Sequence, residues 1–79
     1  MREFKLNDEY AINCVTLNSR SGFKHVATLL KNGEDIATTK CLYFNRTWER
    51  FQYESVLCKL IDKCFKGAER EQFLNVINK

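Results

Sequence analysis

The sequence predicts a single α+β domain with the element order β-β-β-α-α. Three observations lead to this fold class: three runs rich in β-forming residues, turn residues between them, and a later segment whose apolar residues repeat with a helical period. A chain of 79 residues forms one domain, so residues 1–79 make one unit. Such a chain buries only roughly 60% of the surface its unfolded form exposes, which leaves little room for a deep substrate cleft.

Residues 9–18, 23–31 and 34–44 are predicted to form a three-stranded antiparallel β-meander, because these runs contain β-forming residues and are separated by turn signals. The segment 18–22 has the composition of a turn. The pair Asn32-Gly33 is the strongest short hairpin signal in the chain.

One long amphipathic helix is predicted over residues 52–66, followed by a short C-terminal helix over 69–78. The apolar stripe of the long helix comprises Tyr53, Val56, Leu57, Leu60, Ile61, Cys64 and Phe65. Cys64 falls in the middle of this stripe and is expected to be buried, whereas Cys58 points elsewhere and is expected to be accessible. Gly67 can supply the left-handed residue that ends the helix. A three-stranded sheet cannot bury itself, so the long helix must cover one of its faces.

The register of the second hairpin has two alternatives. A two-residue turn at Asn32-Gly33 places Lys31 opposite Glu34 and leaves charged residues on both faces. A three-residue turn places Lys24 opposite Lys40 and collects a nearly uncharged face made of Phe23, His25, Ala27, Leu29, Ala37, Thr39, Cys41 and Tyr43. Because a register slip moves every side chain to the other face, the segregation of charge favours the second alternative.

The opposite face then carries Lys24 and Lys40 among apolar residues, namely Val26, Leu30, Ile36 and Leu42, with Thr28. Exposed apolar area rimmed by charge is typical of an interaction site. The alternative is that Phe4 and Leu6 of the N-terminal segment cover this face. Unpaired strand edges and this apolar face also suggest a homodimer.

No residue constellation supports catalysis, so we expect a non-enzymatic protein with no cofactor and no metal. His25 is the only histidine and is interpreted as a packed or partly exposed strand residue. The four cysteines lack the paired spacing of zinc ligands. Without a secretory signal they are expected to be reduced, mostly buried thiols of a cytoplasmic protein. No apolar run is long enough to span a membrane.

Five aromatic residues between positions 43 and 53 alternate with charged residues where the last strand meets the long helix. Asn45 or Thr47 could cap a helical turn, and Trp48 could anchor the junction. Arginine beside aromatic rings is also typical of protein hot spots and of base-stacking surfaces. The candidate binding residues are therefore Arg46, Arg50 and Trp48, together with Lys24 and Lys40 on the sheet.

The run Asn45-Arg46-Thr47-Trp48-Glu49, followed by Phe51, Tyr53-Glu54 and Leu57, resembles a run in small uncharacterised proteins of phages and integrated mobile elements. In those proteins, too, a strand leads into the run and a helix follows it. The resemblance covers roughly residues 40–62. It implies an origin in a phage or mobile element, and it implies no mechanism.

These observations favour a protein-interaction module, for example an inhibitor or adaptor that acts on a host or defence protein. The alternative is a small nucleic-acid-binding module that presents Lys24, Lys40, Arg46 and Arg50 to a groove. A net charge of +3 and a pI of about 8.7 permit contact with nucleic acid without indicating it.

Overall fold

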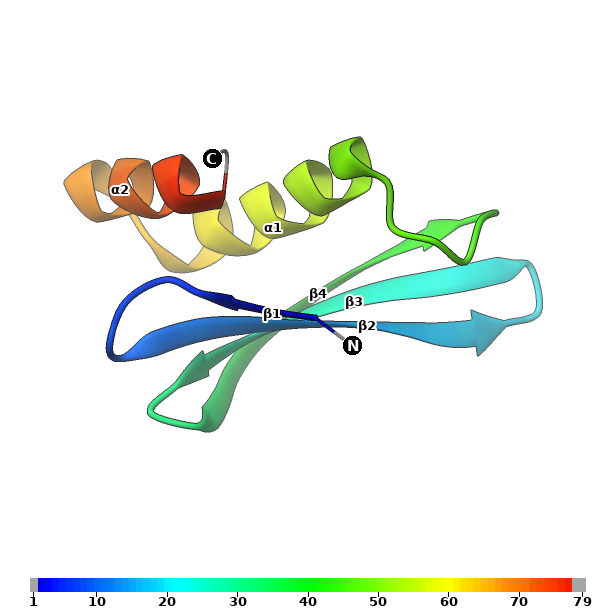
Figure 1. The fold of residues 1–79 in the computed structure, drawn as a ribbon, viewed down its shortest axis with the longest axis horizontal. Helices are drawn as coiled ribbons and strands as arrows, with labels where there is room; N and C mark the ends of the chain where they lie inside the picture. Colours follow the sequence, from blue (N-terminus) through cyan, green and yellow to red (C-terminus); the bar gives the residue numbers. More distant parts are fainter. Residues whose placement is uncertain (1, 78–79) are drawn as a thin grey trace.

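The computed structural model describes residues 2–77 and shows a four-stranded antiparallel sheet with two helices. The strands are β1 (Arg2–Lys5), β2 (Tyr10–Ser19), β3 (Gly22–Lys31) and β4 (Glu34–Tyr43), and the helices are α1 (Arg50–Cys64) and α2 (Gly67–Ile77). Neighbouring strands in the chain are neighbours in the sheet, and both helices lie on the same side of it (Figure 1). The α+β class and the meander are confirmed, but the prediction of three strands is wrong because β1 adds a fourth.

Strand β1 has no clear sequence signal because three of its four residues are charged. It pairs with β2 so that Phe4 lies opposite Ile12. Both side chains point toward the helices, and Leu6, just after β1, is buried in the core. The N-terminal segment therefore extends the sheet and does not cover its other face, so that alternative is wrong.

The hairpin between β3 and β4 combines features of both predicted registers. At the turn, Lys31 lies opposite Glu34, as a two-residue turn requires. Asn32 and Gly33 have φ values of 52° and 87°, and two positive values are what the tight type I′ hairpin needs. The favoured three-residue turn is therefore wrong.

A β-bulge then restores the predicted division of the faces. Leu30 lies opposite Asp35, but Leu29 lies opposite Ala37, so Ile36 is an extra residue in β4. Beyond the bulge the nearly uncharged face is the one predicted, and the helices cover it. The bulge also shifts the pairing so that Lys24 lies opposite Leu42 and not opposite Lys40, which keeps like charges apart.

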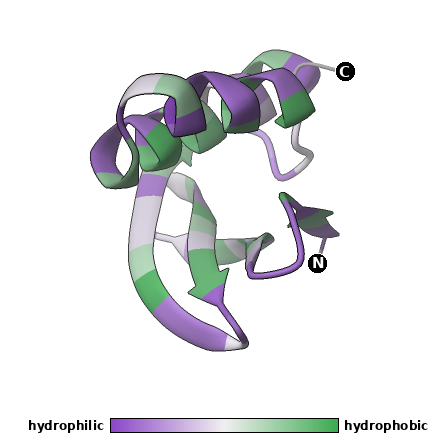
Figure 2. Ribbon diagram, turned by 90° about the vertical axis from the view of Figure 1, so that its left-hand side faces the viewer, coloured by the Kyte–Doolittle hydropathy of each residue, from purple (hydrophilic) through white to green (hydrophobic). Residues whose placement is uncertain are grey.

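Helix α1 packs its apolar stripe on the covered face of the sheet. Four of its aliphatic residues are fully buried, namely Val56, Leu57, Leu60 and Ile61. They meet a sheet surface that includes the small residues Cys14 and Ala27, which let the helix approach closely. The hydrophobic residues of both helices gather on the side toward the sheet (Figure 2). The helix begins and ends two residues earlier than predicted.

Helix α2 docks through Phe73, which is 1% exposed. The Phe73 ring contacts Phe65 and Tyr10 edge to face, with ring centroids 4.6 and 5.8 Å away. Gly67 has the predicted left-handed φ of 64°, but it stands at the start of α2. The predicted helix 69–78 is thus found over residues 67–77, and residue 78 lies outside the described residues.

The cysteines are all free, as predicted, but only Cys14 is buried. Burial raises the pKa of the Cys14 thiol to about 11, so this thiol stays protonated at neutral pH. Cys58 and Cys64 are both half-buried, so the expected contrast between them is wrong. Phe65, which follows α1, fills the core at this end in place of Cys64.

Candidate functional site

The predicted site residues fall into two places on opposite sides of the sheet. Lys24 and Lys40 project from the face without helices, because they alternate with the buried residues of β3 and the covered residues of β4. Arg46, Trp48 and Arg50 lie at or beside the junction between β4 and α1, on the helix side. The predicted nucleic-acid surface combined lysines and arginines, and the structure does not bring the two sets together.

The face without helices is referred to below as the open face. Its residues come from all four strands and alternate with the core positions: Glu3, Lys5, Ala11, Asn13, Val15, Leu17, Lys24, Val26, Thr28, Leu30, Asp35, Ile36, Thr38, Lys40 and Leu42. Leu17, Ile36 and Leu42 are 52%, 49% and 51% exposed, which is high for large aliphatic side chains in strands. Figure 1 shows no helix on this side of the sheet. The open face is thus a broad surface on which exposed aliphatic side chains lie among charged and polar ones.

The two lysines give the open face its charge near its centre. Val26 lies opposite both Val15 and Lys40, and Lys24 lies opposite both Leu17 and Leu42. Neither lysine forms an ion pair with any residue between 2 and 77. The open face therefore places two free ammonium groups beside exposed aliphatic side chains.

Trp48 occupies the middle of an aromatic stack on the helix side of the sheet. Its ring stacks on His25 at a centroid distance of 4.5 Å and on Tyr53 at 4.9 Å. Its indole N–H donates a hydrogen bond of 2.7 Å to Thr16 Oγ1. Because both faces of the indole are occupied, Trp48 cannot stack on a nucleic-acid base, and it acts as the structural anchor of the junction.

A buried glutamine fixes the rest of the junction. Gln52 is 1% exposed, and its side-chain oxygen accepts a 2.6 Å hydrogen bond from the backbone N–H of Glu49, the N-cap of α1. Its amide donates to Asn45 Oδ1 at 2.7 Å. Asn45 therefore supports the helix start through Gln52, and neither Asn45 nor Thr47 is the cap that the sequence suggested.

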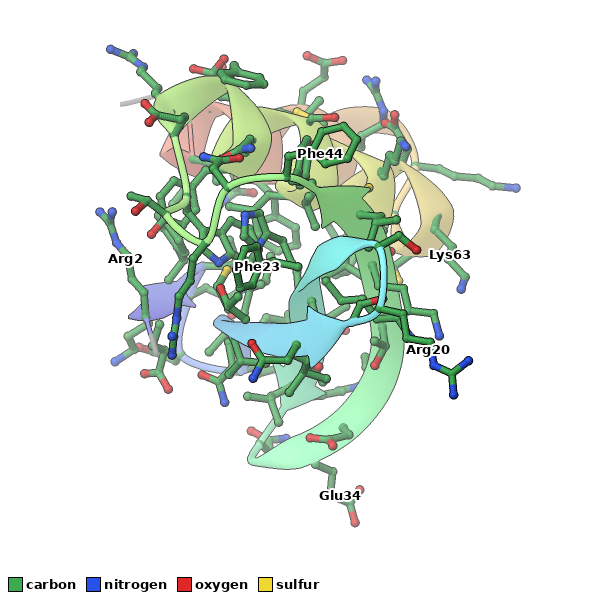
Figure 3. The ribbon with its side chains drawn as sticks, turned by 90° about the vertical axis from the view of Figure 1, so that its right-hand side faces the viewer. Arg2, Arg20, Phe23, Glu34, Phe44 and Lys63 are labelled. Atoms are coloured by element: carbon green, nitrogen blue, oxygen red, sulfur yellow. The ribbon has the colours of Figure 1, made fainter. Side chains whose placement is uncertain are left out.

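Two adjoining hollows have volumes of about 420 and 330 Å³. Arg2, Trp48 and Tyr53 line both of them. We call this pair of hollows the arginine groove. The larger hollow also contains Arg50, and the smaller one contains Arg46. Arg2 could not be predicted as a site residue because β1 has no clear sequence signal, and Figure 3 shows Arg2 projecting from β1.

The three arginines of the groove differ in their partners. Arg50 pairs with Glu54 at 3.2 Å, and both side chains are exposed, so this pair contributes little stability. The Arg2 guanidinium lies over the rings of Phe4 and Tyr53, 4.7 and 5.0 Å from their centroids. Arg46 is exposed. Neither Arg2 nor Arg46 pairs with a carboxylate of the described chain.

His25 is fully buried between Trp48 and Tyr43, which confirms its interpretation as a packed strand residue. Its Nδ1 lies 3.3 Å from Thr16 Oγ1, and its Nε2 is buried without a hydrogen-bond partner in the described structure. Burial lowers the pKa of His25, and the backbone at Thr47 and Asn45 opposes this shift only in part. The ring is therefore neutral in the folded protein at neutral pH.

The lowered pKa of His25 makes stability depend on pH. As the pH falls below about 6.5, the unfolded chain binds a proton at His25 before the folded protein does. We therefore expect the free energy of unfolding to decrease as the pH falls from neutral through the ordinary histidine pKa of about 6.5, as measured by urea denaturation. In the His25→Gln variant, the free energy of unfolding should decrease less over the same pH range. An NMR titration of the His25 ring in the native protein should give a midpoint below about 6.5. An equal decrease in the variant, or a higher midpoint, would contradict this assignment.

Comparisons of the chain with models of protein families, with curated proteins and with solved structures found no match. Within residues 2–77, no three histidine, cysteine or carboxylate side chains gather closely enough to hold a metal ion. None of the helices found in the same range has the length and apolar character needed to cross a membrane.

Proposed function

We propose that this protein is a small non-enzymatic interaction module that binds a partner protein through its open face. The observation that carries this proposal is the exposure of Leu17, Ile36 and Leu42, each about half exposed, on a sheet face that no helix covers. Exposed apolar side chains rimmed by charge are typical of interaction sites on soluble proteins. In a phage or mobile element, such a module would act as an inhibitor or adaptor of a host or defence protein.

The charge of the open face indicates the chemistry of the partner. Lys24 and Lys40 are the charges nearest its centre, and both are positive, whereas the carboxylates of Glu3 and Asp35 lie near its margins. A partner with aliphatic residues ringed by carboxylates would bury the apolar side chains and pair both ammonium groups. A second copy of this chain centred on this face would bring the central lysines of the two copies toward each other, so a foreign partner fits better than a homodimer.

Nucleic-acid binding is the second candidate, and the neighbouring positions of Lys24 and Lys40 favour it. Phosphate groups bind to positively charged side chains, and the aliphatic side chains around these two lysines have no charge or hydrogen-bond donor for a phosphate. The arginines of the groove lie on the other side of the sheet and would not contact the same duplex face. The open face therefore supports a protein partner better than a nucleic acid.

The test is capture of partners from a lysate of the native cells by the immobilised protein and two aspartate variants. Leu42→Asp introduces a negative charge on the open face, whereas Phe51→Asp changes an exposed apolar residue on the helix side. Both substitutions are at exposed positions and should change stability by no more than about 0.5 kcal/mol. We expect Leu42→Asp to reduce binding at least about tenfold, as a loss of about 1.4 kcal/mol would, and Phe51→Asp to bind normally.

Three outcomes would contradict the proposal. If nuclease treatment removes everything captured, the partner is a nucleic acid. If light scattering shows a dimer that Leu42→Asp dissociates, the open face binds a second copy. If Leu42→Asp and the native protein capture the same partner equally well, the open face is not the binding surface.

A further inference from the structure

Strand β2 extends well beyond the strand that pairs with its outer edge. It has ten residues, and β1 pairs only with the four from Ala11 to Cys14. From residue 15 to residue 19, the outer edge of β2 has no strand beside it in the described part of the chain. An unpaired edge exposes backbone N–H and C=O groups that can pair with another extended chain.

The smaller hollow of the arginine groove opens at this unpaired edge. Val15 and Thr16 of β2 line it together with Arg2 and Arg46, and its volume is about 330 Å³. The Thr16 side chain points to the helix side of the sheet, where its oxygen meets Trp48. A residue opposite Thr16 on an added strand would point to the same side, because directly paired residues share a face. Its side chain would therefore enter the hollow that Arg2 and Arg46 line.

We propose that the unpaired edge of β2 binds an extended acidic segment of a partner protein as an added strand, with a carboxylate of that segment held by Arg2 and Arg46. The backbone of the segment pairs with β2 beyond Arg2, the first residue of β1, which lies opposite Cys14. Guanidinium groups match carboxylates in shape and charge, and neither arginine is neutralised by a carboxylate of the described chain. The same two positive charges disfavour edge-to-edge pairing between two copies. This surface is separate from the open face and does not depend on it.

A designed peptide tests the proposal directly. The probe is a capped peptide of about six residues, a typical strand length, with alternating threonine and valine and one central glutamate. Trp48 is the only tryptophan and lines the hollow, so its fluorescence reports occupancy. We expect saturable binding that weakens with salt. We also expect binding to fall about tenfold when glutamine replaces the glutamate, the effect of one charge-assisted hydrogen bond. Methylation of alternate backbone nitrogens in the peptide should abolish binding, because it blocks strand pairing.

Two variants of the protein separate this surface from the open face. Arg46→Gln should weaken binding of the glutamate peptide about tenfold, by loss of the same charged contact. Lys40→Gln, the matched control on the open face, should leave peptide binding unchanged. The proposal is overturned if no peptide binds, if the glutamine or methylated peptide binds as tightly, or if Arg46→Gln has no effect. These outcomes leave the capture experiment with Leu42→Asp unaffected, so the two proposals fail separately.

Discussion

Replacing Trp48 by alanine is expected to lower the free energy of unfolding by about 3–5 kcal/mol, the usual loss for a large packed ring. The substitution removes two stacking contacts, with His25 and Tyr53, and the hydrogen bond from the indole to Thr16. It also opens a cavity where β4 leads into α1. Because Trp48 is the only tryptophan, the measurement is urea denaturation followed by circular dichroism.

Trp48→Phe is the matched control, because it keeps a ring in the stack and removes the indole N–H. Its expected cost is smaller than that of Trp48→Ala and includes about 1 kcal/mol for the hydrogen bond to Thr16. If Trp48→Ala costs less than Trp48→Phe, or less than about 1 kcal/mol, the aromatic stack is not a structural anchor.

Replacing Phe73 by alanine is expected to cost about 3–5 kcal/mol as well. Phe73 is the buried residue of α2, and its ring joins that helix to Phe65 and Tyr10. Its loss should lower the stability of the whole domain, because the same rings close one end of the core. Thermal denaturation followed by circular dichroism gives the change in stability.

Phe44 provides the control for this substitution within the same chain. Its side chain is 91% exposed and projects from the end of β4 (Figure 3). Phe44→Ala should therefore change stability by no more than about 0.5 kcal/mol. If Phe73→Ala unfolds α2 but leaves the stability of the sheet and α1 unchanged, the two helices do not share one cooperative core.

The parts of the fold that carry a strong pattern could be predicted from the sequence. The apolar repeat of α1 identifies its buried side chains, and Asn32-Gly33 identifies the tight turn. Strand β1 could not be predicted, because its pairing depends on backbone hydrogen bonds and its side chains are mostly charged. The bulge at Ile36 could not be predicted from the sequence either. A three-residue turn without a bulge and a two-residue turn with one extra residue in β4 place the same side chains on each face.

The sequence indicates which residues are candidates for binding, but it does not indicate how these residues are placed relative to one another. Lys24 and Lys40 were placed correctly on the open face, since charge segregates from the core. The distance of these lysines from Arg46 and Arg50 depends on the path of the chain after β4. The residue types in that segment do not determine this path. Arg2 reaches the arginine groove because it lies on β1, which was not predicted. The edge of β2 is unpaired beyond Cys14 because β1 has only four residues.

Site-specific photo-crosslinking tests whether the open face is the partner-binding surface. A photoreactive residue is placed at position 42 on the open face or, in a second variant, at position 72 on the exposed side of α2. After irradiation in a lysate of the native cells, position 42 should give a protein adduct of one discrete mass. This adduct should resist nuclease, diminish when unlabelled native protein competes, and persist when unlabelled Leu42→Asp is added instead. An adduct that forms from position 72 and not from position 42 would show that the open face is not the binding surface.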